Sequence, residues 1–323
     1  MTFNELADKF LTARKTRVTA TTYALYERHL SQHIRPTIGT LRIDAIRQQH
    51  IEDVLTAAHD HSRTKRKGKP LAGGTLRNIL VTLRACLQHA VRNDWLTRNV
   101  AQRVETPSRE SVREPVLFDA AKVKRVLTAA IGTEIEPVIA FAIATGARRG
   151  EICALRWCDV DLQQGRYTIR RSAANIGKQV VYKQPKSKHS RRTDVLAPFI
   201  AELLRLHHRQ QKKRWLALGL GRIDDEAFVF TRADATPWNP NELSRQFSRL
   251  VRRKKFGAIR FHDLRHGHAS LAFAAGVPLR TISESLGHSS IGITSSIYVH
   301  LLDEGRREKA QRLDAYLRDA VGS

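Results

Sequence analysis

The chain has 323 residues and a formal net charge of +25, from 56 Lys and Arg against 31 Asp and Glu. Hydrophobic residues make up 41% of the sequence, which is enough for packed cores and excludes a disordered basic tail. A folded protein with this charge is expected to bind a polyanion. The basic excess lies in both halves of the chain, which favours a nucleic acid gripped by two domains.

The cysteine content and the pattern of apolar residues limit where in the cell the protein can work. Three cysteines are too few for a disulfide framework, and Cys153 and Cys158 have no second Cys or His pair at zinc-binding spacing. We therefore expect reduced thiols in a cytoplasmic protein, without a bound metal. Residues 1–10 have no apolar signal core, and no stretch approaches ~20 apolar residues, so no membrane segment is expected.

The first hundred residues have the pattern of a helical domain. Thr2 followed by Glu5 forms a capping box, which predicts a helix start. Apolar residues at helical spacing predict four helices, over residues 3–11, 23–34, 46–58 and 76–91. We expect Pro36 and Gly39 to stop the second helix. A basic loop over 63–74 should separate the last two helices.

A polar stretch follows this domain. Residues 106–115, TPSRESVREP, have no apolar periodicity and contain two prolines and two serines, which is typical of a linker. We therefore predict a first domain over residues 1–106, a linker over 107–117 and a second domain over 118–323.

The second domain is predicted to be mixed but mostly helical. Asp119 is placed to cap its first helix, and the apolar run 137–145 predicts a buried helix that ends at Gly146. Three short β-rich runs follow, with a turn expected at Asn175–Gly177, and helices resume from Pro198. The β-rich runs cover residues 166–171, 179–183 and 191–196. The predicted fold is thus mainly α, with a small antiparallel sheet of two or three strands.

Two basic segments in this domain carry candidate chemistry. In TGARRGEICALRW, residues 145–157, Arg148 lies at a turn between buried elements, where an arginine is rare unless it is paired. An ion pair with Glu151 is the purely structural alternative. In PKSKHSRRT, residues 185–193, the cations lie between two strands, at a predicted hairpin tip that can reach phosphates. Alone, that segment is better interpreted as a solvated basic turn.

Two further segments contain titratable groups. In HDLRHGHAS, residues 262–270, His262 and Arg265 are three residues apart and share a helix face, which suits a phosphate centre. A metal site with the neighbouring histidines is disfavoured, because no carboxylate or cysteine joins them at a known ligand spacing. In LGHSSIGITSSIYVH, residues 286–300, Gly287 should end one helix, and Tyr298 falls about two turns into the next.

Together the four segments resemble the tyrosine recombinases, also called the phage integrase family. The resemblance covers roughly residues 1–320 and is densest over 262–300. It implies that Arg148 and Arg265 are the catalytic arginines, that His262 and His288 are the catalytic histidine positions and that Tyr298 is the nucleophile. Lys186 matches the catalytic lysine of the β-hairpin, with Lys188 as the alternative.

The resemblance also implies an architecture and a chemistry. It implies a SAM-like core-binding domain and a catalytic domain that form a C-shaped clamp on double-stranded DNA. Cleavage would proceed through a 3′-phosphotyrosyl bond without metal, ATP or other cofactor, and the sequence has no G-x-x-x-x-G-K-[ST] loop. The protein is expected to be a monomer in solution and a homotetramer on two DNA duplexes, with its C-terminal helix docked on a neighbouring copy.

Two alternatives remain open at this point. A type IB topoisomerase shares the chemistry but rejoins the same strand, so stoichiometry on DNA separates the two. A non-catalytic DNA-binding regulator would use the predicted helices 263–275 and 279–286 as a helix-turn-helix. The presence of Tyr298 together with both arginines argues against the regulator. The target sequence, and the choice between a mobile-element integrase and a Xer-like resolvase, are left undecided by the sequence.

Overall fold

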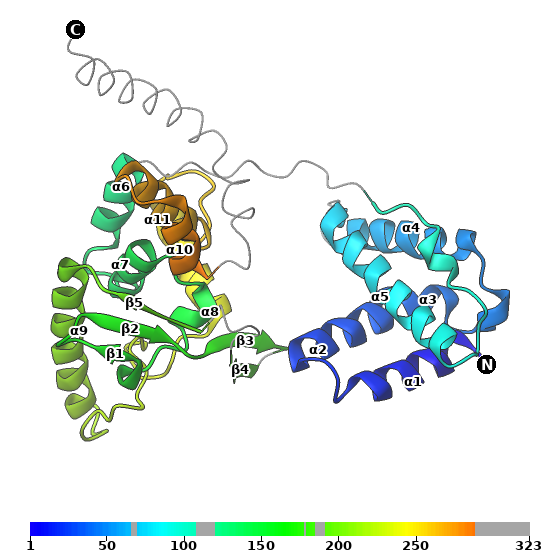
Figure 1. The fold of residues 1–323 in the computed structure, drawn as a ribbon, viewed down its shortest axis with the longest axis horizontal. Coiled ribbons are helices and arrows are strands. Elements are labelled where there is room, and N and C mark those ends of the chain that lie inside the picture. Colours follow the sequence, from blue (N-terminus) through cyan, green and yellow to red (C-terminus); the bar gives the residue numbers. More distant parts are fainter. Residues whose placement is uncertain (66–69, 108–119, 178, 185–190, 288–323) are drawn as a thin grey trace, which may run out of the picture. The chain divides into compact units, whose positions relative to one another are not determined.

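The computed structural model describes residues 1–65, 70–107, 120–177, 179–184 and 191–287 (Figure 1). The chain divides into two compact units, Met1–Glu114 and Pro115–Ser323. Each unit has its own hydrophobic core. Across the described part of the chain, no helix combines the length and the apolar character needed to cross a membrane.

The first unit is a helical bundle. Its helices are α1 (Phe3–Arg14), α2 (Ala20–His29), α3 (Arg35–Ile38), α4 (Gln48–Lys65) and α5 (Gly73–Arg92). The predicted capping box is present, since the Glu5 N–H donates to Thr2 Oγ1 at 3.3 Å and the Thr2 N–H donates to Glu5 Oε2 at 2.8 Å. The apolar face of α5 is buried against α1 and α4, which places the core along the longest helix.

Two helix boundaries in this unit differ from the prediction. The second helix does not stop at Pro36, because a π-helical turn, Leu30–Ile34, joins α2 to α3 and the helical path ends only at Gly39. The Arg35 N–H donates to the Leu30 carbonyl, and this wider turn tolerates a proline that lacks an N–H of its own. The basic loop is also shorter than predicted, since α4 extends to Lys65 and α5 begins at Gly73.

The second unit is built around one apolar helix. Its helices are α6 (Ala120–Ala130), α7 (Glu136–Thr145), α8 (Arg149–Ile152), α9 (Pro198–Ala217), α10 (Pro240–Arg253), α11 (Asp263–Ala274) and α12 (Leu279–Leu286). The prediction of a buried helix over 137–145 is confirmed, because α7 is apolar all round and contacts α6, α8, α9 and α11.

The strands form two small antiparallel sheets rather than one. They are β1 (Val160–Asp161), β2 (Arg166–Ile169), β3 (Ser172–Ile176), β4 (Gln179–Lys183) and β5 (Arg192–Val195). One sheet has the order β1-β2-β5, and β3 pairs with β4 in the other. Asn175 and Ile176 belong to β3, so the predicted turn begins only at Gly177, which has a left-handed φ of 58°.

The sheet pairing corrects the prediction for the basic segment 185–193. Since β4 pairs with β3 and β5 pairs with β2, the connection from β4 to β5 joins two sheets, and it is not the tip of a hairpin. The sequence missed this because β3, with the residues SAANI, has little of the β-branched or aromatic character that marks a strand.

A glycine junction connects α7 to the last two described helices. Gly146 ends α7 with a φ of 61°, and a Cβ built at this position would lie 2.5 Å from Leu286 Cδ2 and 2.8 Å from His268 Cδ2. His268 Nδ1 lies 3.0 Å from the carbonyl oxygen of Ile143 in α7. The end of α7 is therefore in close contact with both α11 and α12.

We expect Gly146→Ala to destabilise the protein more than Gly132→Ala. Both positions have positive φ, which costs an alanine about 1–2 kcal/mol, but nothing lies within 4 Å of a Cβ at Gly132. The crowded Gly146 site adds an overpacking cost of about 1–3 kcal/mol. Thermal or urea unfolding of the two variants measures the difference, and equal losses of stability would contradict the close approach at Gly146.

Candidate active site

Arg148 lies at the junction between α7 and α8. After Gly146 turns the chain, Arg148 has an extended backbone (φ −68°, ψ 147°) and is the residue immediately before α8. Its backbone N–H donates to Glu151 Oε2 at 2.8 Å, and its guanidinium Nη1 donates to Glu151 Oε1 at 2.8 Å. The ion pair with Glu151, which the sequence suggested as the structural alternative, is thus present. The Arg148 side chain still has 37% of its surface exposed, so it remains accessible to a ligand.

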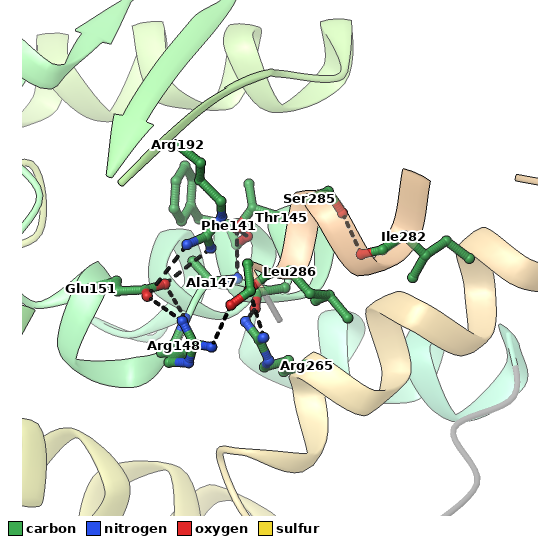
Figure 2. A network of polar contacts seen from close by, with 12 residues as sticks. Phe141, Thr145, Ala147, Arg148, Glu151, Arg192, Arg265, Ile282, Ser285 and Leu286 are labelled. Carbon is green, nitrogen blue, oxygen red and sulfur yellow. Dashed lines mark hydrogen bonds and ion pairs between the residues drawn. The ribbon is translucent and has the colours of Figure 1, made fainter. Parts of the chain in front are cut away.

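Arg265 lies in the first turn of α11 and is buried, with 4% of its surface exposed. Its Nη1 donates to the Gly146 carbonyl at 2.7 Å and its Nη2 donates to the Leu286 carbonyl at 2.6 Å. Arg148 Nη2 donates to the next carbonyl, that of Gly287, at 3.0 Å. The two guanidiniums therefore meet at the C-terminal end of α12, where carbonyls lack helix partners and the helix dipole is negative (Figure 2).

A second arginine holds the carboxylate that Arg148 binds. Arg192, the first residue of β5, donates from Nη2 to Glu151 Oε2 at 3.0 Å and from Nη1 to Glu151 Oε1 at 3.4 Å. The side chains of Arg192 and Glu151 are only 7% and 3% exposed. Burial alone would raise the pKa of Glu151, but the two guanidiniums outweigh it and hold that pKa below its ordinary value.

Sequence reasoning missed Arg192 as a member of the site. The residue was grouped with the other cations of the segment 185–193, without a distinction between buried and exposed positions. One signal was available, because the buried Leu196 lies four residues on, so an alternating strand puts Arg192 on the same inward face. Its partner is 41 residues away, and spacing along the chain gives no indication of that contact.

His262 lies immediately before α11, and its ring centroid is 5.3 Å from that of His266. Burial, together with the nearby His266 and Arg265, lowers the pKa of His262 to about 4. The pKa of His266 is also lowered, mainly by burial. At neutral pH the His262 imidazole is therefore uncharged and has a nitrogen that can accept a proton or a hydrogen bond.

The structure brings three of the six predicted site residues together. Arg148, His262 and Arg265 belong to one cluster, since both arginines act electrostatically on His262. Lys186, the alternative Lys188, His288 and Tyr298 lie outside the described residues. Within the described ranges, no group of three or more His, Cys, Asp or Glu side chains is arranged to hold a metal ion.

Comparisons with known proteins identify the family. A model of the phage integrase family matches residues 117–305, and a model of the phage integrase N-terminal SAM-like domain matches residues 2–57. A XerC-like tyrosine recombinase of Caldanaerobacter subterraneus subsp. tengcongensis is 25% identical over 322 residues, covering 94% of this chain and 80% of that protein. The ICEBs1 integrase of Bacillus subtilis is 28% identical over 253 residues, covering 76% of this chain and 67% of that protein.

Solved structures share the fold. The Tn1549 transposon integrase in complex with transposon right end DNA superposes with a TM-score of 0.78 at 21% identity, over 97% of this chain and 100% of that one. A lambda integrase dimer bound to a COC′ core site gives a TM-score of 0.65 at 18% identity, over 92% of this chain and 77% of that one.

The fold is that of the tyrosine recombinases. The chain belongs to the phage integrase family, whose model matches more than half of its length, and it is a site-specific recombinase. The resemblance inferred from the sequence and the mainly helical fold class are thereby confirmed.

We expect His262 to titrate well below an ordinary histidine. Its pKa of about 4 lies under the usual 6.5, so the unfolded chain takes up a proton first as the pH falls. The contribution of this residue to stability is therefore complete above pH 6.5 and is lost as the pH falls towards 4. Imidazole NMR spectra at pH 6 should show a neutral His262, assigned by comparison with His262→Gln.

The stability measurement gives an independent check of the same prediction. Between pH 7 and pH 5 the free energy of unfolding should fall less steeply for His262→Gln than for the wild type. If the free energies of unfolding of the wild type and His262→Gln fall in parallel with pH, and the His262 signal titrates near 6.5, the imidazole is not held in its neutral form.

Proposed function

We propose that this recombinase cleaves and rejoins DNA strands through a 3′-phosphotyrosyl intermediate, with Tyr298 as the nucleophile. The observation that carries the proposal is the convergence of Arg148 and Arg265 on one place beside a neutral His262. Two guanidiniums and an imidazole are the groups expected around a phosphodiester under attack, because charge develops on its non-bridging oxygens. The family match over residues 117–305 supports the assignment.

The strand transfer has two balanced steps. The Tyr298 oxygen attacks the scissile phosphorus, the bond from phosphorus to the 5′-oxygen breaks, and the departing 5′-oxygen takes a proton. A 5′-hydroxyl from the second duplex then attacks the phosphotyrosyl bond, and the tyrosine oxygen leaves with a proton. The phosphotyrosyl linkage conserves the energy of the broken phosphodiester bond, so no ATP is needed. The two guanidiniums neutralise the charge that a metal ion would otherwise neutralise, so we assign no cofactor.

Each candidate residue has a role in this scheme. Arg148 and Arg265 hold the non-bridging oxygens, and His262, being uncharged, accepts the tyrosine proton. Lys186 supplies the proton to the leaving 5′-oxygen, and Lys188 is the alternative for that role. His288 donates a hydrogen bond to the phosphate.

We further propose that the two domains have separate roles and that the protein assembles into an oligomer on DNA. Residues 1–106 bind the core site as the SAM-like domain, 107–117 are the linker, and 118–323 carry the chemistry, including the C-terminal helix. Crystal structures of lambda integrase as a dimer on a core site and as a tetramer on a Holliday junction support a homotetramer on two duplexes. The +25 charge opposes self-association, so the protein is a monomer until DNA phosphates neutralise it.

The cellular setting follows from the thiols and the substrate. All three cysteines are free, two of them buried, as expected of a protein that works under reducing conditions in the cytoplasm. We propose that its substrate there is double-stranded DNA of a mobile element and its host, because the chain is similar to a transposon integrase solved with transposon right end DNA and to the ICEBs1 integrase.

Tyr298→Phe should bind DNA with near-normal affinity yet form no covalent adduct. The variant removes the nucleophilic hydroxyl and keeps the ring for packing. A DNA substrate nicked near the cleavage site traps the wild-type adduct on a denaturing gel, and EDTA should leave the amount of adduct unchanged. Adduct formation by the variant, loss of the adduct in EDTA, or an adduct mapped by mass spectrometry to Tyr316, the other tyrosine of the C-terminal segment, would refute the proposed chemistry.

The lysine assignment has a chemical test. Lys186→Ala should lose cleavage of ordinary DNA but recover it on DNA whose bridging 5′-oxygen is replaced by sulfur, because a thiolate leaves without a proton. Lys188→Ala, the matched control two residues away, should cleave ordinary DNA almost as the wild type does. The opposite pattern would assign the proton donor to Lys188.

A further inference from the structure

Helix α8 fixes the strand that precedes the basic segment 185–190. A Cβ built on Gly150 would lie 2.4 Å from the carbonyl oxygen of Ala173, so the backbones of α8 and β3 touch. Strand β3 pairs with β4 from Ser172↔Lys183 to Ile176↔Gln179. The chain that enters the basic segment at the end of β4 is thereby held, through β3, against the helix that follows Arg148.

The same helix fixes the strand that follows this segment. Arg192 begins β5, lies opposite Ile169 of β2 and sends its guanidinium onto the carboxylate of Glu151 in α8. Figure 2 shows Arg192 and Arg148 approaching that carboxylate from different sides. Both strands that flank residues 185–190 are thus connected to residues 148–151.

The hydrogen bonds of Glu151 are shared evenly between its two arginines. Oε1 accepts from Arg148 Nη1 at 2.8 Å and from Arg192 Nη1 at 3.4 Å. Oε2 accepts from the Arg148 backbone N–H at 2.8 Å and from Arg192 Nη2 at 3.0 Å. Without Arg192 each oxygen keeps only the donor from Arg148, so the contact with β5 that orients the carboxylate and the guanidinium bound to it is lost.

We propose that Arg192 is a positioning residue: through Glu151 it sets the orientation of the Arg148 guanidinium. The inference rests on the proposed function, in which Arg148 binds the scissile phosphate. Arg192 itself is 7% exposed and bound to a buried carboxylate, so it acts through Arg148 and through the strand that it begins.

The ionisation of Glu151 distinguishes a positioning role of Arg192 from a role in stability alone. The groups that face it are Arg148 at the start of α8, Arg192 of β5 and Tyr167 of β2, whose own pKa is raised by burial so that it stays neutral. Removing Arg192 leaves burial as the largest influence, and the pKa of Glu151 then rises. A protonated Glu151 no longer attracts the Arg148 guanidinium, so cleavage by the variant should fail at a pH where the wild type still works.

The test measures the rate of adduct formation on nicked DNA as a function of pH. Arg192→Ala should bind DNA as the wild type does but cleave roughly 10²-fold more slowly, as expected for a misplaced catalytic group. The acid limb of its pH–rate profile should move to higher pH, and adding Glu151→Gln should abolish that limb. Arg192→Lys keeps the charge but not the paired hydrogen bonds, so its rate should fall without movement of the limb.

A matched control removes an arginine from the same sheet. Arg166 of β2 is exposed, and Arg166→Ala should cleave at the wild-type rate with an unchanged pH profile. Should Arg192→Ala fail to fold, Arg192→Lys measured against Arg166→Ala decides the question by its rate. Rates for both Arg192 variants equal to the control, or a loss that merely follows the folded fraction with an unmoved acid limb, would overturn the inference.

Failure of the proposed function gives a different result. In that case the wild-type protein itself forms no adduct with nicked DNA, and the positioning role of Arg192 is excluded together with the proposed function. A wild type that forms the adduct beside Arg192 variants that match the control overturns the positioning role alone.

Discussion

The buried carboxylate of Glu151 is the contact on which the rest of the site depends. An ionised carboxylate with 3% of its surface exposed is costly to desolvate, and two guanidiniums from distant parts of the chain offset that cost. One comes from the turn after the apolar helix α7 and the other from the start of β5. Removing a single partner of such a buried pair typically costs about 3–5 kcal/mol, because an unpaired charge is left behind. The contact therefore joins helix and sheet, and it also fixes the geometry of Arg148.

Two helix ends supply the remaining acceptors. Gly146 and Gly287 both have left-handed backbones that close α7 and α12, and the carbonyls of Gly146, Leu286 and Gly287 accept from the two site arginines. Helix C-termini leave carbonyls without partners, and a cation there is favoured by the helix dipole. Each arginine thus completes a helix end and belongs to the candidate site. Because His288 directly follows Gly287 in the sequence, Arg148 also fixes the last described residue before the segment that leads to Tyr298.

Local sequence patterns predicted the helices well and the long-range contacts poorly. The capping box at Thr2 and the apolar run of α7 involve neighbours in the chain, so periodicity and capping chemistry were sufficient for them. Strand β3 was missed because its small residues form a strand only by pairing with β4 and by contact of Ala173 with Gly150. At the site, the motifs selected Arg148, His262 and Arg265 by resemblance, and the ion pair with Glu151 was considered as the structural alternative because a buried arginine is rarely unpaired. Nothing local indicates that Arg192 shares that carboxylate, because the contact exists only once the sheet has formed against α8.

The charges of the site suit the proposed phosphoryl transfer. The hydrogen-bonded cluster contains three guanidiniums, those of Arg148, Arg192 and Arg265, and one carboxylate, so two positive charges are left uncompensated. A phosphodiester carries one negative charge, whereas the same phosphorus under attack by a tyrosine oxygen that has given up its proton carries two. In the proposed step an uncharged His262 has a nitrogen that can take the tyrosine proton, whereas an imidazolium has no free acceptor. The burial that lowers the pKa of His262 therefore keeps the imidazole ready for this proposed proton transfer, and the positive charge that it gains arises together with the second negative charge on the phosphoryl group.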